Sequence, residues 1–225
     1  MKPDYDIAII GGGMVGASLA VSLLQAARRY SLKVAVFEAY PLPKAGIDEL
    51  QPSYDARSTA LSYGSRNLLE KMGVWSQLSQ QVSPISHIKV SDRGHFGAVR
   101  LDAQRQGVPA LGYVVENRWL GQVLLNRLAA EVDSPVDLHC PAEVLSAEPL
   151  NQGMKLSVQQ QGEVVELSAG LVVMADGGRS ELRQRLAIDY SDSDYQQYAV
   201  VSNLTLDRPH QNIAYERFTE SGPMA

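Results

Sequence analysis

Near the N-terminus, one segment has the residue types and spacing of a phosphate-binding turn. The run Gly11–Gly16 (GGGMVG) matches the pattern GxGxxG. In that pattern the first glycine permits a tight turn, the second lets a pyrophosphate approach the backbone, and the third lets a helix pack close to a sheet. The helix that follows presents backbone N–H groups and a positive dipole end to the phosphates. The segment therefore predicts binding of a dinucleotide.

The elements around this turn are the ones needed to position it. Asp6–Ile10 is an Ile-rich apolar run typical of a buried strand, and an amphipathic helical pattern follows the glycines. Lys33–Glu38 predicts a second strand, whose last residue is an acid suited to hydrogen bonding a ribose diol. Such a βαβ unit also serves an NAD-dependent oxidoreductase. The alternative to a binding site is that the glycines form an ordinary turn and that Glu38 is a solvated side chain with no ligand.

Three more residues stand at positions where side chains reach a ligand. Asp176 follows the apolar run Leu171–Ala175 and precedes glycines, which predicts a turn at the carboxyl end of a buried strand. Arg57 comes just before a predicted helix over Ser58–Met72, with Ser58 as its N-cap and Gly73 as its terminator. Arg118 begins a predicted helix that ends at residue 132. The alternatives are two surface arginines and an aspartate that merely caps a turn.

The remaining pattern predicts an α/β protein with an antiparallel excursion. Short alternating runs between Pro84 and Val115 predict strands around the turn Arg93–Gly97. A hairpin is expected later in the chain, formed by strands Met154–Gln160 and Glu163–Ser168. A short helix is expected over Ser180–Leu186 and strand-like structure over Ala199–Phe218. Residues 40–56 are expected to form a loop. The strands after Tyr190 are expected to pair with the excursion.

Composition excludes several classes of function. The 20 Lys and Arg against 25 Asp and Glu give a net charge of -5, which argues against a nucleic-acid-binding protein. The single Cys140 cannot form an intramolecular disulfide, so a reducing, cytoplasmic setting is the simplest fit. No metal site is expected, because metal-ligand spacing is missing among the histidines, interpreted as surface residues: His87, His95, His139 and His210. Trp75 and Trp119 are interpreted as packing residues.

Five segments together resemble a known family. They are IIGGGMVGASLA, DARSTALSYGSRNLLEKMGVW, KVSDRGHFGAVRL, LGYVVENR and YERFTESGPMA. Over essentially its whole length the chain resembles the flavoprotein aromatic hydroxylases, the group A monooxygenases typified by para-hydroxybenzoate hydroxylase, and among them the ubiquinone-biosynthesis branch. The resemblance implies a Rossmann-like FAD-binding α/β fold with an antiparallel β segment on the substrate side. Measured against that family the chain stops within a domain, so a C-terminal truncation is expected.

The resemblance also implies a division of the chain and a set of site residues. Residues 1–83 and 114–189 would form the FAD-binding domain, and residues 84–113 and 190–225 an incomplete substrate domain. The cofactor-binding residues implied are Gly11, Gly12, Gly13, Met14, Gly16, Glu38, Arg57, Arg118, Asp176 and Gly177.

Each group of these residues has an implied role. The glycines and Glu38 would hold the ADP half of FAD, and the two arginines would lie along the pyrophosphate and flavin. Asp176-Gly177 corresponds to a motif that serves FAD and the transient nicotinamide, although Met174 stands where the family usually has glycine. Glu216 or Arg217 would face the substrate, without a catalytic role assigned to either.

The function implied is FAD-dependent hydroxylation of a polyprenyl phenol in ubiquinone biosynthesis. In the family, NAD(P)H reduces the flavin, which reacts with O2 to give a flavin hydroperoxide that attacks an electron-rich ring. The implied partners are the polyprenyl phenol, O2 and proteins of a ubiquinone-biosynthesis complex, with peripheral contact at the inner membrane and no spanning helix. A non-catalytic scaffold subunit of that complex is the alternative outside the enzymes.

Overall fold

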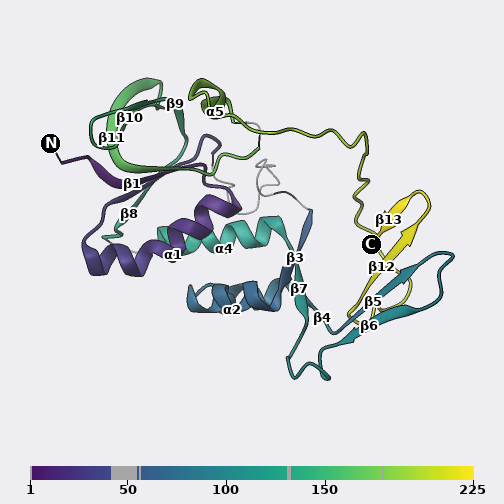
Figure 1. Cartoon of the computed structure of the whole chain (residues 1–225). Coiled ribbons are helices and arrows are strands. Elements are labelled where there is room, and N and C mark those ends of the chain that lie inside the picture. Colours follow the sequence, from purple (N-terminus) through teal and green to yellow (C-terminus); the bar gives the residue numbers. More distant parts are fainter. Residues whose placement is uncertain (1, 42–54, 56, 131–132, 179) are drawn as a thin grey trace. The chain divides into compact units, whose positions relative to one another are not determined.

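The computed structural model describes residues 2–41, 55, 57–130, 133–178 and 180–225 (Figure 1). The chain divides into two compact units, each built from two stretches of sequence. Unit 1 comprises residues 1–55 and 120–199, and unit 2 comprises residues 56–119 and 200–225. Most of the loop predicted over residues 40–56 lies outside the described residues. The division into an FAD-binding and a substrate domain remains a prediction about function.

Unit 1 is built on a six-stranded sheet in the order β8-β2-β1-β11-β10-β9. Its strands are β1 (Tyr5–Ile10), β2 (Val34–Phe37), β8 (Val136–His139), β9 (Ala142–Pro149), β10 (Met154–Gln160) and β11 (Glu163–Met174). Strands β8, β2, β1 and β11 run parallel, whereas β11, β10 and β9 pair antiparallel. The parallel βαβ unit predicted from the sequence is confirmed.

Helices and side chains cover both faces of the central part of this sheet. Helix α1 (Met14–Tyr30) packs on β1, β2 and β8 through small and aliphatic residues, among them Ala17, Ala20 and Leu24. The opposite face is closed by Leu182 of helix α5 (Glu181–Arg185) and by side chains of β9 and β10. Strand β2 is buried along its whole length, as expected of a parallel strand covered on both sides.

The sequence predicted two separate strands, Glu163–Ser168 and Leu171–Ala175, where the structure has the single strand β11. Glu163–Met174 is one strand of 12 residues. Its first part pairs antiparallel with β10 across the predicted Gln161-Gly162 hairpin, and its last part pairs parallel with β1. In this last part Leu171 is 55% exposed and residues 172–175 are half-buried, so the strand is less buried than predicted. Val172 and Met174 from this part of the strand still pack against the core of unit 1.

The helix predicted over Ser58–Met72 is shorter in the structure, because its first five residues belong to a strand of the first sheet of unit 2. Residues Ser58–Ser62 form strand β3, and helix α2 is confined to Tyr63–Lys71 with Ser62, not Ser58, as its N-cap. Long-range pairing explains the difference, because β3 pairs antiparallel with β7 (Gly112–Glu116), which also pairs with β4 (Val82–Ile85). A short helix α3 (Trp75–Leu78) and a 3₁₀ turn over Ser79–Gln81 follow.

The second sheet of unit 2 has four strands in the order β13-β12-β5-β6. They are β5 (His87–Asp92), β6 (Ala98–Asp102), β12 (Ile213–Thr219) and β13 (Gly222–Met224). The predicted turn between β5 and β6 is confirmed, and β12 pairs parallel with β5, as expected for the late strands. The strand predicted from Ala199 onward begins only at Ile213, because residues 199–212 have no ladder partner among the described residues.

Helix α4 (Asn117–Ala129) begins at the end of β7 in unit 2 and continues into unit 1. Its predicted apolar positions, Leu120, Val123, Leu124 and Leu128, are all buried. Within the described ranges, no helix is long and apolar enough to cross a membrane. The same residues contain no group of His, Cys, Asp and Glu able to hold a metal ion.

Candidate cofactor site

The glycine turn between β1 and α1 has a backbone that side chains would obstruct. Gly11 has a φ of +99°, and a Cβ atom on it would lie 2.5 Å from the carbonyl oxygen of Ala175. A Cβ on Gly16 would lie 1.9 Å from the carbonyl oxygen of Gly11. Gly13 is the N-cap of α1, so no side chain caps the first turn of that helix. These constraints match the roles that the sequence pattern assigns to the first and third glycines.

Glu38 is held at the end of β2 by the same turn. Its side chain is buried, with 4% exposed, and Oε2 accepts a hydrogen bond of 2.7 Å from the backbone N–H of Gly12. Oε1 accepts a second, of 2.9 Å, from the backbone N–H of Tyr40. A carboxylate has about four acceptor positions, so these two bonds fix the group and leave capacity for the two hydroxyls of a ribose. The solvated-glutamate alternative is therefore wrong.

Asp176 and Gly177 lie beside the glycine turn because β1 and β11 end together. Ile10 is paired with Met174, and the N–H of Ala175 donates to the carbonyl of Ile10 at 2.7 Å. The Asp176 side chain is exposed and accepts a hydrogen bond of 2.6 Å from Ser180. The two motifs, more than 150 residues apart in the sequence, thus occupy neighbouring carboxyl ends of one parallel pair of strands.

Sequence reasoning missed the residues that support the Asp176 turn. Ser180 is buried, caps α5 by accepting from the N–H of Arg183 at 3.1 Å, and donates to Asp176. The Arg183 guanidinium donates to the carbonyl of Gly178 at 3.1 Å and lies 3.8 Å from the ring centre of Tyr190. In the sequence, Ser180 followed three residues later by Arg183 indicates at most the start of a helix. It does not indicate a ligand site, so these residues could not be predicted as part of one. Ser180 is the N-cap of α5, while Asp176 accepts from Ser180 within the turn before that helix.

The two arginines predicted for the pyrophosphate and flavin side come together within unit 2. Ser58 of β3 is paired with Glu116 of β7, and the carbonyl of Arg57 accepts from the N–H of Asn117 at 2.9 Å. The residue that follows, Arg118, forms an ion pair of 2.6 Å through Nε with Glu116. Strand pairing therefore brings Arg57 and Arg118 to one end of the β3–β7 ladder.

Buried Asn117 holds this end of the ladder in place. Its side-chain oxygen accepts a hydrogen bond of 2.6 Å from the hydroxyl of Thr59. The Arg118 guanidinium lies over the ring of Trp119 at 5.6 Å. Trp75 packs edge-on against Tyr113 with ring centres 4.7 Å apart, which confirms its interpretation as a packing residue.

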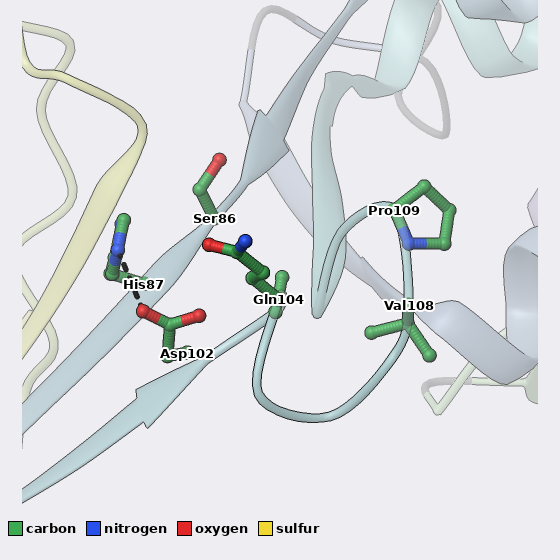
Figure 2. Close-up of a pocket in the computed structure, with 7 residues that line it drawn as sticks. Ser86, His87, Asp102, Gln104, Val108 and Pro109 are labelled. Atoms are coloured by element: carbon green, nitrogen blue, oxygen red, sulfur yellow. Dashed lines mark ion pairs between the residues drawn. The ribbon is translucent and has the colours of Figure 1, made fainter.

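A hollow of about 340 Å³ lies within unit 2, beside strands β5 and β6 (Figure 2). His87 and Asp102 face each other across β5 and β6, with Nε2 and Oδ2 3.2 Å apart. Gln104 lies beside them, and Val108 and Pro109 form an apolar wall on the other side. Hydrogen bonding from the backbone N–H of Arg105 is the main cause that lowers the pKa of Asp102. His95 pairs instead with Asp92 at the hairpin turn.

His139 differs from the surface histidine predicted. Its ring is half-buried and stacks on Phe37 with ring centres 4.9 Å apart. The Tyr5 hydroxyl lies 2.9 Å from Nε2 of His139 and donates to Asp137 at 3.1 Å. Burial, followed by the negative charge of Asp137, raises the pKa of Tyr5 to about 12. This cluster supports the end of β2 that carries Glu38, because the carbonyl of His139 accepts from the Glu38 N–H at 2.9 Å.

Comparison with known proteins identifies the family. Residues 4–220 match the FAD binding domain family, and the chain belongs to it. The chain is 32% identical to a ubiquinone hydroxylase of Rhodospirillum rubrum and 31% identical to 3-demethoxyubiquinol 3-hydroxylase of Escherichia coli, covering 98% of this chain and 48% and 53% of those proteins. The chain thus spans about half the length of the curated relatives it matches.

Among solved structures, monooxygenases have a similar fold. The crystal structure of p-nitrophenol 4-monooxygenase from Pseudomonas putida superposes with a TM-score of 0.67 at 16% identity, over 85% of this chain and 45% of that one. At this identity the likeness concerns the fold alone. The α/β FAD-binding fold expected from the sequence is confirmed.

Proposed function

We propose that this chain is the FAD-binding part of a monooxygenase that hydroxylates a polyprenyl phenol in ubiquinone biosynthesis. The observation that carries the proposal is the meeting of the glycine turn, buried Glu38 and the Asp176-Gly177 turn at adjacent strand ends. Similarity to two ubiquinone-related hydroxylases over 98% of the chain supports the substrate class. Within that branch the sequence resembles 2-octaprenyl-6-methoxyphenol hydroxylase, so that reaction is the leading candidate.

The residues present fit the ADP half of FAD. The backbone at Gly11 and Gly13 is free of side chains, and the N-terminus of α1 has no side-chain cap, so a pyrophosphate can take the position of a capping group. Glu38 is held in place by two backbone N–H groups and would accept hydrogen bonds from the ribose hydroxyls. In this proposal Gly12 and Met14 line the turn, Gly16 lets α1 pack closely, and Asp176 with Gly177 contacts FAD and a transient nicotinamide.

Arg57 and Arg118 are proposed to neutralise the pyrophosphate and to orient the flavin. Support comes from the family resemblance and from their meeting at one end of the β3–β7 ladder. When bound, FAD supplies the redox chemistry that moves one atom of O2 to an aromatic ring, and NAD(P)H is the proposed reductant. The protein's part is to bind, orient and exclude water. No residue of this chain is assigned a catalytic role.

Two alternatives differ in class from this proposal. An NAD-dependent oxidoreductase would use the same βαβ unit, but the match to the FAD binding domain family favours the flavin. A scaffold subunit of a biosynthetic complex would keep the fold without turnover. Flavin absorbance of the purified chain tests the first alternative. Hydroxylation of polyprenyl phenols by the chain and by longer forms of the protein tests the second.

The sharpest test of the cofactor site is Gly13→Asp, with Gly13→Asn as its control. Gly13 has φ −64° and ψ −175°, which any residue can adopt, and both Asp and Asn are good N-cap residues. Both variants should therefore keep or raise thermal stability. Only the aspartate places a negative charge where the pyrophosphate binds, so the affinity for FAD should fall about a hundredfold further in Gly13→Asp than in Gly13→Asn.

Fluorescence titration of FAD into the apo protein measures both dissociation constants. Equal constants for the aspartate and asparagine variants would overturn the placement of the pyrophosphate at α1. Tight FAD binding together with the absence of hydroxylation in longer forms would leave the flavin site standing and favour the scaffold alternative.

A further inference from the structure

One face of the four-stranded sheet in unit 2 collects cationic side chains. Residues paired across strands point to the same face of a sheet, and Tyr215, Lys89 and Arg100 are paired in one row across β12, β5 and β6. The next row toward the hairpin turn contains Arg217, Ser91 and Ala98, with Met224 of β13 opposite Arg217. We call this surface the basic face.

Contacts within the basic face agree with this assignment. Lys89 Nζ lies 5.5 Å from the ring centre of Tyr215. Asp102, the one acid of the three rows, lies in the row at the far end and faces His87 with Oδ2 and Nε2 3.2 Å apart. The other acids of these strands, Asp92 and Glu216, alternate to the opposite face.

The basic face is open to solvent. Arg100 and Arg217 are exposed, and Tyr215 and Met224 are 57% and 63% exposed. At the turn between β5 and β6, Phe96 is fully exposed and lies between Arg93 and Gly97. An open surface on which cations alternate with an aromatic ring and a thioether suits an interface between water and an apolar phase.

Charge is distributed unevenly between the two units. Unit 1 contains 10 Lys and Arg against 18 Asp and Glu, whereas unit 2 contains 10 against 7; the net charges of −8 and +3 add to the −5 of the chain. The chain as a whole is therefore negatively charged, whereas unit 2 by itself carries a net positive charge. Attraction to an anionic surface depends on the charges within a Debye length, about 8 Å at physiological salt.

We propose that the basic face of unit 2 docks on an anionic phospholipid bilayer, with Phe96 entering the boundary between headgroups and acyl chains. Lys89, Arg100 and Arg217 would contact lipid phosphates, while Tyr215 and Met224 would lie at the depth of the headgroups. This inference rests on the proposed function for its purpose, since a polyprenyl phenol resides in the membrane. The binding itself involves no flavin and no turnover.

The test is cosedimentation of the purified chain with vesicles. Vesicles of phosphatidylcholine alone are compared with a three-to-one mixture of phosphatidylcholine and phosphatidylserine. We expect binding to the anionic vesicles only, and loss of most of it when salt rises from about 0.1 M to about 1 M, because the Debye length falls from about 10 to about 3 Å.

Two variant pairs locate the surface. The double variant Arg100→Glu/Arg217→Glu should weaken vesicle binding roughly tenfold or more, whereas Lys2→Glu/Lys33→Glu changes the net charge equally on exposed residues of unit 1 and should have little effect. Phe96→Ser should weaken binding several-fold, and Val164→Ser, at an exposed apolar position of the β10–β11 hairpin, should not. Circular dichroism checks that every variant is folded.

Each outcome bears on the proposal. Equal binding to neutral and anionic vesicles, or equal losses in test and control variants, would overturn it. Salt-sensitive self-association that Arg100→Glu/Arg217→Glu abolishes, without vesicle binding, would assign the basic face to the acidic unit 1 of a second copy and also overturn it. Vesicle binding with no affinity for FAD would support the docking surface while overturning the proposed function.

Discussion

The two sheets that matter most in this protein differ in how they are covered. The adjacent strands β1 and β2 of unit 1 are packed on both faces, and Ala8, Ile9 and Val36 have no exposed surface. The four-stranded sheet of unit 2 has half-buried or exposed side chains on both faces, including Val99, Tyr215 and Phe218. A fully covered sheet holds a backbone turn at a fixed position, as a phosphate site requires. An open sheet is suited to contact other molecules.

The strongest test of this contrast substitutes two phenylalanines. Phe37→Ala removes a side chain that is 1% exposed and should reduce the free energy of unfolding by about 3–5 kcal/mol. Phe96→Ala removes a fully exposed ring and should change it by less than about 0.5 kcal/mol. Urea denaturation followed by circular dichroism measures both. Similar losses in the free energy of unfolding for the two variants would contradict the difference in burial between the two sheets.

A smaller effect is expected at the proposed ribose contact of unit 1. Glu38→Ala removes the acceptor of two backbone hydrogen bonds, which should cost about 1.5–3 kcal/mol of stability and lower FAD affinity about tenfold to a hundredfold. Glu38→Gln keeps one acceptor oxygen and should retain most of the stability. Thermal melts and FAD titrations of both variants separate the two roles. Wild-type FAD affinity in Glu38→Ala would remove Glu38 from the site.

The smallest effect is a pH dependence confined to unit 1. Burial and Asp137 raise the pKa of Tyr5 to about 12 from its ordinary value of 10.0. Because the folded pKa is the higher one, the stabilising contribution is complete below about pH 10 and is lost as the pH rises through about 12. Tyrosine absorbance at 295 nm should therefore show one late-titrating residue that is missing in Tyr5→Phe. A Tyr5→Phe protein with an unchanged titration would contradict the assignment.

Local patterns predicted the first βαβ unit of the molecule well. The run Asp6–Ile10, the glycines and Glu38 are close in sequence, so strand, turn and helix follow from residues that also contact one another. Prediction failed at Ser58–Ser62, where pairing with β7 outweighs the helical pattern. It failed again before Ile213, where alternating apolar residues find no strand to pair with in the described part of the chain.

Contacts between distant segments could not be predicted from local patterns. Nothing near Arg57 in the sequence indicates that it lies beside Asn117 and Arg118, because the register of β3 on β7 determines it. The pair of His87 and Asp102 depends in the same way on the register of β5 on β6. Side-chain alternation is visible in the sequence, but the choice of partner strand is not.

The pairing of β1 with β11 has a consequence for synthesis on the ribosome. The first strand of the chain joins residues near 170, with Tyr5 opposite Ala169. At about 5–20 residues per second, roughly ten to thirty seconds separate the appearance of the glycine turn from that of the Asp176 turn beside it. During that interval one edge of β1 lacks its partner strand. Until β11 has been synthesised, the backbone groups on that edge of β1 lack the hydrogen bonds that they make in the finished fold, and an unpaired strand edge favours association with other chains.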